Sequence, residues 1–388
     1  MFDQLLISWK QLSFTKSRFF ISIVGVTFSV ALMFINTGLR DGIFEDSVTI
    51  HKTLQGDLVI LKNDVSNLWS IAGKTFTRRI LFSVENIEGV ESANPFYFNW
   101  GDFKNPTNSK EKSIAVCAFN IDKPTFNIPA IKEQTELLKK RDSFLFDRLS
   151  RPEYGAIGKL VEENGKVDIE LSRHKITVDG LFALGGGILS IDGLTVTSDS
   201  NFIRLFQHKN LGEANLGLIN LKPGFDPQEI KAKIASQLPR GLKIITKDEF
   251  IAKEKQYWLT NSPVGFIFSV VAVIGLIFGA IIVYQILFTQ ISDYLSVYAT
   301  FKAIGYSNGY LMSTVLQESF MMAVLGFFPG YVICIFMYDF IENATRLPMI
   351  MNAERMIIVM VSIMVMCIFA AIGSIAKLRD ADPADLFK

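Results

Sequence analysis

The chain is poor in cysteine and histidine, the residues that form disulfides and bind most transition metals. Its 388 residues include only three cysteines and three histidines. Cys117 is the one cysteine between residues 40 and 260, so this segment has no partner for an internal disulfide. His51, His174 and His208 are far apart and lack the short spacing of metal ligands. The composition therefore gives no support to a disulfide scaffold or to a metal site.

A nucleotide-binding loop is also missing. The stretch "AGKTFT" ends like such a loop at Gly73-Lys74-Thr75, but Leu68 stands where the motif needs its first glycine. We therefore expect no ATPase activity, no bound cofactor and no catalytic residues in this chain.

Charged residues are scarce outside one central segment. The chain has 39 basic and 38 acidic residues, 77 in all, and residues 40–260 contain 59 of them. Hydrophobic residues make up 49% of the chain, and its mean hydropathy is +0.31. This pattern predicts a chain that is part membrane and part water-soluble. The soluble part carries 30 basic and 29 acidic residues, so its charge does not suggest nucleic acid as a partner.

Four apolar runs are long enough to cross a bilayer, which takes about 20 helical residues. The runs 19–39 and 356–376 each contain 21 residues without a charge. Residues 264–288 lie inside a charge-free stretch, and 319–338 add 20 more residues. A cleaved signal peptide is the less favoured interpretation of the first run, because its lead is long and no small-residue cleavage pattern follows.

Basic residues beside the spans predict the orientation of the chain. Short flanking segments rich in lysine and arginine mark the cytoplasmic side of a membrane. The flanking basic residues are Lys10, Lys16, Arg18, Lys377, Arg379 and Lys388. We therefore expect a multi-pass protein of the inner (plasma) membrane with both termini cytoplasmic.

The predicted boundaries follow from these runs. The segments are a cytoplasmic N-terminal segment 1–18, a span 19–39, an extracytoplasmic domain 40–260, a span 264–288, a cytoplasmic coupling helix 289–310, a span 311–338, a short periplasmic loop 339–355, a span 356–376 and a cytoplasmic tail 377–388. The fold class predicted is a four-helix membrane protein with a large α+β domain inserted between the first two transmembrane helices.

Two strand–helix–strand patterns lie near the ends of the inserted domain. In 216–245, Asp226 is a helix N-cap residue and is followed by proline at the first helical position. Residues 57–100 have the same order of elements. The patterns predict two subdomains, which are a split outer part, 40–100 with 216–260, and an inserted part, 101–215.

A further helix is predicted to lead from the domain into the second span. Thr246 and Glu249 form a capping box. If this helix ran on to Gln290 it would be about 65 Å long and would stand above the membrane as a stalk. The pair Ser262-Pro263 is where it would instead restart or kink.

Two glycine pairs lie in the predicted spans. Gly275 with Gly279, and Gly326 with Gly330, have the four-residue spacing that allows close helix packing. The same spacing is common by chance, so both interpretations stay open.

The stretch "YATFKAIGYSNGYLMSTVLQES", residues 298–319, is too patterned for a simple turn between two spans. If residues 294–304 are helical, one face carries the apolar side chains of Tyr294, Val297, Tyr298, Phe301 and Ile304. This predicts an amphipathic helix at the cytoplasmic surface that Gly305 terminates. It is either a lid over the turn or a docking helix for a cytoplasmic partner.

This stretch resembles the cytoplasmic loop of the MacB/FtsX-like family of ABC transporter permeases. There a (K/R)-A-(I/M/L)-G motif ends a coupling helix, and an acidic residue is common at the start of the third span. The matching residues in this chain are Lys302, Ala303, Ile304, Gly305 and Glu318. One departure is Val297, which stands where the family usually has glutamate.

Within that family, the first part of the chain is most similar to the DevC-type permeases, the membrane subunits of the heterocyst glycolipid exporter. "SRFFISIVGV" resembles the first span of that group, and His51, Leu54, Asp57 and Leu58 resemble the sequence that follows it. The tail "DADPADLF", residues 380–387, resembles the closing motif of the family.

The resemblance implies a homodimer paired with two copies of a separate cytoplasmic ABC ATPase, which would bind the ATP and Mg²⁺. It implies an exporter that works with a periplasmic adaptor and an outer-membrane channel on a glycolipid or other amphipathic substrate. The residues expected to couple to the ATPase are Phe301, Lys302, Ala303, Ile304, Gly305 and Glu318, with Phe301 as the main anchor. The alternative is an FtsX-like regulator of an extracytoplasmic wall hydrolase, and a membrane-anchored enzyme is the third possibility.

Overall fold

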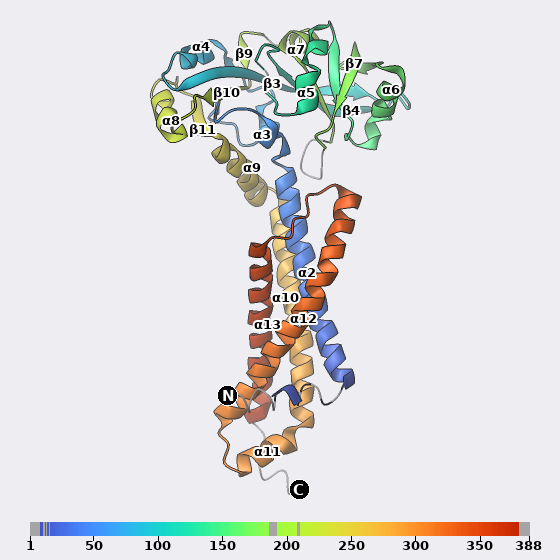
Figure 1. Ribbon diagram of the computed structural model, residues 1–388, viewed down its shortest axis with the longest axis vertical. Helices are drawn as coiled ribbons and strands as arrows, with labels where there is room; N and C mark the ends of the chain where they lie inside the picture. The colour runs from blue at the N-terminus through green and yellow to red at the C-terminus, as the bar shows by residue number, and fades with distance from the viewer. Residues whose placement is uncertain are drawn as a thin grey trace. The chain divides into compact units, whose positions relative to one another are not determined.

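The computed structural model describes residues 8–10, 12, 14, 16–123, 125–185, 192–207 and 210–379 (Figure 1). The predicted closing motif at 380–387 lies outside these residues. The chain divides into two compact units. We call residues Met1–Gly42 with Pro263–Lys388 the membrane unit, and Ile43–Ser262 the sheet unit.

The described part of the membrane unit is helical. Its main helices are α2 (Lys16–Asp46), α10 (Pro263–Asp293), α11 (Leu295–Ala303), α12 (Asn308–Thr345) and α13 (Ala353–Arg379). Within the described residues, four helical segments are long and apolar enough to cross a membrane, namely Phe19–Asp46, Pro263–Asp293, Asn308–Thr345 and Ala353–Ser374. With the α+β domain inserted between the first and second of them, the predicted fold class is confirmed.

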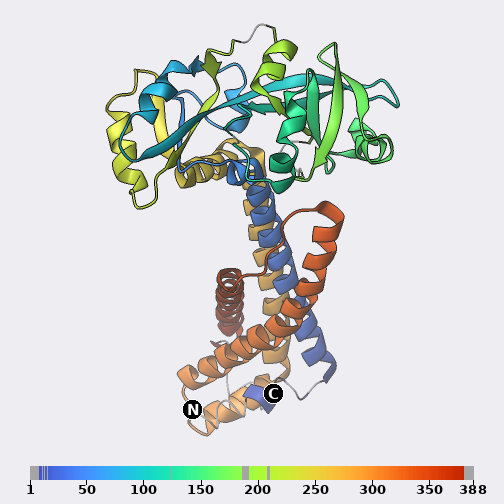
Figure 2. The same ribbon diagram turned by 45° about the horizontal axis from the view of Figure 1, so that its top comes forward.

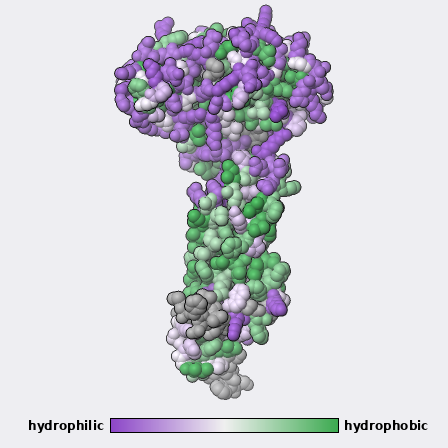
Figure 3. Space-filling view, in the orientation of Figure 1, coloured by the Kyte–Doolittle hydropathy of each residue, from purple (hydrophilic) through white to green (hydrophobic). Residues whose placement is uncertain are grey.

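The side chains on the outside of these helices are mostly apolar, as contact with lipid requires. The space-filling view shows hydrophobic residues over most of the visible face of the membrane unit, and hydrophilic residues over that of the sheet unit (Figure 3). Phe266, Phe336 and Phe369 are among the large apolar side chains that are mostly exposed in the single chain. Burying such groups in hydrocarbon is favourable, whereas exposing them to water is not.

Glycines bring α2 and α12 into close contact. A Cβ atom added to Gly326 would lie 2.5 Å from Val26 Cγ1, and one added to Gly330 would lie 2.7 Å from Val30 Cγ1. Thr27 Oγ1 donates a 3.1 Å hydrogen bond to the Gly326 carbonyl at the same contact. This glycine pair is therefore a packing surface, as small residues spaced by four allow in membranes.

The glycine pair in α10 behaves differently at its two positions. A Cβ atom on Gly279 would lie 2.4 Å from Met366 Sδ and 2.6 Å from Ser29 Oγ. A Cβ atom on Gly275 would meet nothing within 4 Å. Only the second glycine of this pair is required for packing.

The sheet unit contains one nine-stranded mixed sheet (Figure 2). Its strands are β1 (Leu58–Lys62), β3 (Val90–Lys104), β4 (Glu111–Phe119), β5 (Ser143–Asp147), β6 (Val167–Leu171), β7 (His174–Phe182), β8 (Leu194–Ser198), β10 (Leu216–Leu221) and β11 (Leu242–Thr246). Their order is β11-β1-β10-β3-β4-β8-β5-β7-β6, with an additional pairing between β3 and β6. β4 pairs with β8, and β5 with β7, in parallel; the other neighbours are antiparallel.

The predicted outer and inserted parts occupy opposite halves of this one sheet. Strands β11, β1 and β10 come from the predicted outer part. Strands β4, β5, β6, β7 and β8 come from the predicted insertion. β3 extends past residue 100 to Lys104 and pairs with β10 on one side and β4 on the other. This long central strand makes the sheet continuous across the predicted boundary.

Helices and short strands complete the unit. They are α3 (Thr49–Thr53), η1 (Leu68–Ile71), β2 (Phe76–Thr77), α4 (Arg79–Glu85), α5 (Pro129–Glu133), η2 (Thr135–Lys139), η3 (Pro152–Tyr154), α6 (Ile157–Asn164), α7 (Asp199–Leu205), β9 (Glu213–Ala214), α8 (Pro227–Ala235) and α9 (Lys247–Asn261). Apolar side chains alternate along the strands into two buried clusters: on β3, Tyr97 joins one and Phe98 the other. This alternation follows from the two-residue period of a strand.

The helix that leaves the sheet unit does not continue into the membrane unit. α9 starts at the predicted capping box, in which Thr246 and Glu249 satisfy each other's backbone N–H groups. It ends at Asn261, and Ser262 is extended with φ −114° and ψ 149°. α10 then begins at Pro263. Proline disfavours helical geometry in the residue before it but fits the first position of a helix, so the Ser262-Pro263 pair produces a break.

Candidate functional site

The turn between α10 and α12 is built around the short helix α11 (Leu295–Ala303). The helix ends in a Schellman motif, because Tyr306 N donates to Phe301 O and Gly305 N to Lys302 O, each at 3.0 Å. Gly305 adopts φ +103°, which is strained for any residue with a Cβ atom. Gly305 is therefore required for the geometry of this turn, as its C-cap prediction anticipated.

Three aromatic side chains pack against one another at the turn. The rings of Phe301 and Tyr306 are 5.4 Å apart and nearly perpendicular, and the ring of Tyr310 lies 4.7 Å from that of Tyr306. A contact between the positions of Phe301 and Tyr306 commonly accompanies a Schellman motif. Tyr306 was not among the predicted site residues, although its position directly after the helix-ending glycine is a signal for this contact.

Ser307 belongs to the pentapeptide Gly305–Gly309, which has the Gly-x-Ser-x-Gly form found around catalytic serines. That motif needs a strand-to-helix turn that exposes the hydroxyl. Here the turn joins two helices, and Ser307 Oγ accepts a 3.2 Å hydrogen bond from Tyr310 N as the N-cap of α12. The role of Ser307 in this structure is helix capping.

Exposure separates the predicted coupling residues. Phe301 is half-buried and packs against the core of the membrane unit. Lys302 is also half-buried, whereas Ala303 and Gly305 are exposed. Ile304 is 70% exposed, more than Val297 or Tyr306, the other exposed apolar side chains described in this turn. The geometry therefore presents Ile304 outward and uses Phe301 to support the turn from within.

Glu318 lies apart from the exposed turn. It is in the third turn of α12 and is fully buried. Neither of its carboxylate oxygens has a hydrogen-bond partner among the described residues. In this conformation the Glu318 side chain does not reach the surface on which a soluble partner would bind.

A polar cluster joins α2, α12 and α13 inside the membrane unit. The Arg355 guanidinium is buried and donates to Asp41 Oδ2 at 3.0 Å and to Tyr338 Oη at 3.3 Å. It also donates to the Ile350 carbonyl, and Tyr338 Oη donates to the Phe34 carbonyl. We call Asp41, Tyr338 and Arg355 the polar clamp.

The backbone of α2 leaves room for the polar clamp. A Cβ atom added to Gly38 would lie 2.4 Å from Tyr338 Oη. The absence of a side chain at this position lets the Tyr338 hydroxyl reach the α2 backbone. The clamp thus fixes the start of α13 to α2.

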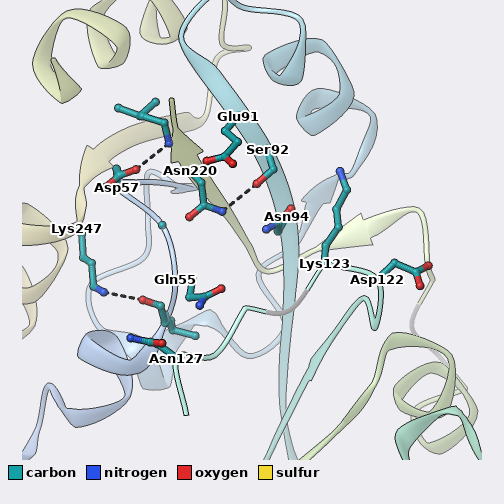
Figure 4. A pocket seen from close by; sticks show the side chains of 13 residues that line it. Gln55, Asp57, Glu91, Ser92, Asn94, Asp122, Lys123, Asn127, Asn220 and Lys247 are labelled. Carbon is teal, nitrogen blue, oxygen red and sulfur yellow. Dashed lines mark hydrogen bonds between the residues drawn. The ribbon is translucent and has the colours of Figure 1, made fainter. Parts of the chain in front are cut away.

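A polar pocket of about 650 Å³ lies in the sheet unit (Figure 4). Thirteen residues line it, and they include neither histidine nor cysteine. Asn220 Nδ2 donates to Ser92 Oγ at 2.9 Å, so the one lining serine is bonded to an amide and not to a base. Asn94 is 3% exposed, and its Oδ1 has no hydrogen-bond partner among the described residues. The pocket offers hydrogen bonds but no nucleophile–base pair.

Metal ligands do not gather in the described part of the chain, where no group of three or more His, Cys, Asp or Glu side chains is placed to hold an ion. His51 is buried with its Nε2 3.2 Å from Glu254 Oε2 and its ring 4.4 Å from that of Phe250. His174 Nδ1 lies 2.9 Å from the Ser172 carbonyl, and His208 is outside the described residues.

Comparison with protein families gives one match. Residues 269–383 match the family described as FtsX-like permease C-terminal. The match covers most of α10 and all of α11, α12 and the described part of α13, including the turn that carries Ile304. No curated protein matches the chain.

Solved structures resemble part of the chain, among them the following two. One is the periplasmic region of MacB from Actinobacillus actinomycetemcomitans, with 9% identity and a TM-score of 0.35, covering 52% of this chain and 92% of that one. The other is the extracellular domain of the noncanonic ABC-type transporter YknZ from Gram-positive bacteria, with 8% identity and a TM-score of 0.33, covering 49% of this chain and 98% of that one.

Proposed function

We propose that this chain is the permease subunit of an ABC exporter of the MacB/DevC type, driven by a separate cytoplasmic ATPase. The observation that carries the proposal is the family match over residues 269–383, which contains the exposed turn between two apolar helices. The proposal assigns no ATP hydrolysis to this chain, so ATP and Mg²⁺ would be bound by the partner.

The turn around α11 is the proposed docking surface for the ATPase. A short amphipathic helix held by a Schellman motif presents the same side chains in a fixed geometry, which lowers the entropy cost of binding. Ile304, with Val297 and Tyr306 beside it as partly exposed apolar side chains, supplies the contact area. Phe301 and Gly305 hold this surface in shape.

Motion at the turn has a route along the chain. α10 leads directly from α11 towards the end of the sheet unit at Ser262, while α2 leads into its start at Ile43. The polar clamp and the glycine contacts join α2 to α12 and α13. In the proposed mechanism, movement of the helices after ATP binding is transmitted to both ends of the sheet unit, in a homodimer with two ATPase copies.

The sheet unit is proposed to lie outside the cell membrane, with both termini in the cytoplasm. Single cysteines at Lys110 and Ser307, both exposed positions, test this in a chain without its native cysteines. We expect Lys110→Cys to react with a membrane-impermeant thiol reagent in intact cells and Ser307→Cys to react only after the membrane is opened. The opposite labelling pattern would contradict the orientation.

The substrate is proposed to be a glycolipid or other amphipathic molecule, passed on through a periplasmic adaptor and an outer-membrane channel. Purification of the tagged chain from its native membrane in mild detergent tests the function. We expect an ABC ATPase and an adaptor protein to be recovered with it. Recovery of a wall hydrolase in place of the adaptor would favour an FtsX-like regulator, and absence of any ATPase would contradict both functions.

A further inference from the structure

Three of the four tryptophans of the chain gather in one place on the sheet unit. Trp69 in η1 stacks on Trp100 in β3 with ring centroids 4.9 Å apart, and it meets Trp258 in α9 edge-on at 6.4 Å. All three side chains are half-buried, and Leu259, the residue after Trp258, is 43% exposed. Residues from three distant parts of the sequence thus form one partly exposed aromatic surface.

A buried carboxylate holds this surface in place. Glu254 Oε1 accepts a 2.9 Å hydrogen bond from the indole Nε1 of Trp258, and its Oε2 accepts one of 2.8 Å from the backbone N of Leu68. One side chain therefore orients Trp258 and fixes the start of η1, which carries Trp69. Because the indole N–H of Trp258 is already bonded, what the ring offers outward is mainly apolar.

Lysines converge on the loop that precedes η1. Lys243 Nζ donates to the carbonyls of Asn63 and Val65 at 2.8 and 3.2 Å, and Lys253 Nζ donates to that of Val65 at 3.0 Å. An ammonium group has three donors, so these bonds leave capacity for a further acceptor. Asn63 to Val65 precede Trp69 by four to six residues, so both lysines are bonded to the segment that leads into the aromatic surface.

The charge at this loop is predominantly positive. Lys74 Nζ lies 3.4 Å from Asp64 Oδ2, whereas no carboxylate of the described residues forms an ion pair with Lys243 or Lys253. Burial and then the neighbouring Lys253 ammonium lower the pKa of Lys243 to about 8. Since two ammonium groups share one carbonyl, an anion bound between them would relieve their repulsion and raise that pKa.

The covalent chain keeps Trp258 close to the start of α10. Trp258 is five residues before Pro263, the first residue of the apolar helix α10. Three of those steps are helical and the rest are at most extended, so the two Cα atoms are no more than about 12 Å apart. Tryptophans this close to a span are typical of the membrane–water interface, where the ring lies at the level of the lipid headgroups.

We propose that this aromatic–lysine face, formed by Trp69, Trp100, Trp258, Lys243 and Lys253, rests on the lipid headgroups of the adjoining leaflet and that the two lysines bind the phosphate of an anionic lipid. The proposal depends on the four spans and not on the ATPase partner. It makes the sheet unit sensitive to the lipid composition of the leaflet on its side of the membrane.

Indole fluorescence tests the proposal directly. In a Trp9→Phe chain every remaining tryptophan belongs to the face. This full-length chain is placed in nanodiscs whose lipids carry bromine on the upper acyl chain, with either phosphatidylcholine alone or added phosphatidylglycerol. We expect the brominated lipids to quench the emission, and the quenching to increase with the fraction of phosphatidylglycerol.

The lysines are tested in the same background by Lys243→Gln with Lys253→Gln. Each lysine near an anionic surface strengthens binding by about fivefold, so losing both should weaken binding by about 25-fold. The fraction of anionic lipid needed for half-maximal quenching should rise accordingly, or half-maximal quenching should not be reached at all. Lys139→Gln with Lys140→Gln, exposed lysines on η2 and just after it, is the matched control and should behave like the parent.

Two results would overturn the proposal. If brominated lipids leave the emission unchanged, the aromatic surface does not contact the bilayer. If quenching occurs equally with and without phosphatidylglycerol, or equally in the Lys243→Gln/Lys253→Gln chain and its control, the lysines do not bind a lipid phosphate. Inorganic phosphate added to phosphatidylcholine discs should not reproduce the effect; if it does, the site binds free phosphate and not lipid.

Discussion

Replacing Ile304 by aspartate is expected to abolish retention of the partner ATPase while leaving the chain inserted and folded. The side chain is 70% exposed in the single chain, so a charge there costs little in the absence of a partner. In a docked interface the same charge would be buried without an ion pair, which is strongly unfavourable. A loss of 2 kcal/mol or more corresponds to at least about a 30-fold loss in affinity.

Two other variants separate docking from support of the turn. Ile304→Leu keeps an apolar side chain of similar volume and should retain the ATPase. Phe301→Ala removes the ring that packs on Tyr306 and on the core of the membrane unit, so we expect it to lower the amount of folded protein as well as ATPase retention. Each variant is compared with the parent by protein yield, by monodispersity and by pull-down of the ATPase from detergent.

The result that would contradict this assignment is full retention and stimulation of the ATPase by Ile304→Asp. If Phe301→Ala then lost the ATPase at normal yield and monodispersity, the docking residue would be Phe301, as its position on the predicted apolar face first suggested.

Breaking the polar clamp with Asp41→Ala is expected to destabilise the membrane unit by about 3 kcal/mol. The variant leaves the Arg355 guanidinium buried with only the Tyr338 hydroxyl and a backbone carbonyl as partners. The loss lies at the lower end of the usual range because the Asp41 side chain is 43% exposed and keeps some access to water. Thermal unfolding of the purified chain in detergent measures the effect.

A double variant makes the test specific. Asp41→Ala with Arg355→Met removes both charges and should recover at least half of the lost stability, because replacing a whole buried pair costs less than orphaning one member. Asp339→Ala removes an exposed carboxylate next to Tyr338 on α12 and serves as the control, with no change expected. Equal destabilisation by Asp41→Ala and Asp339→Ala would show that the clamp contributes nothing.

Local signals in the sequence predicted the elements that depend on neighbours along the chain. The four spans are set by length and hydropathy, which operate within about 20 residues. The capping box at Thr246 and Glu249 and the C-cap at Gly305 each involve residues no more than five positions apart. For the same reason Ser262-Pro263 could be identified as the place where the stalk would break.

Contacts between distant residues could not be predicted in this way. Asp41 and Arg355 are 314 positions apart, and neither their spacing nor their types identify them as a pair. Glu254 looks like an exposed residue of a charged helix, yet it is buried, and one of its donors is the backbone N of Leu68, 186 positions away. Its other donor, Trp258, is one turn further along the same helix. The boundary predicted at residue 100 falls inside β3, because a strand that pairs on both edges is recognised only once its partners are known.

The break at Ser262 gives the two connections to the sheet unit unequal stiffness. α2 is one uninterrupted helix from Lys16 to Asp46, so its backbone hydrogen bonds resist both bending and twisting where it enters the sheet unit. The return path is interrupted between α9 and α10, because the backbone of Ser262 is extended. In the proposed mechanism both connections carry motion to the sheet unit, and α2 carries torque more directly than α10 does, because only α2 enters the unit as a continuous helix. Replacing Ser262 and Pro263 by alanine would let α9 and α10 join as one helix. The second connection would then resist bending and twisting as α2 does.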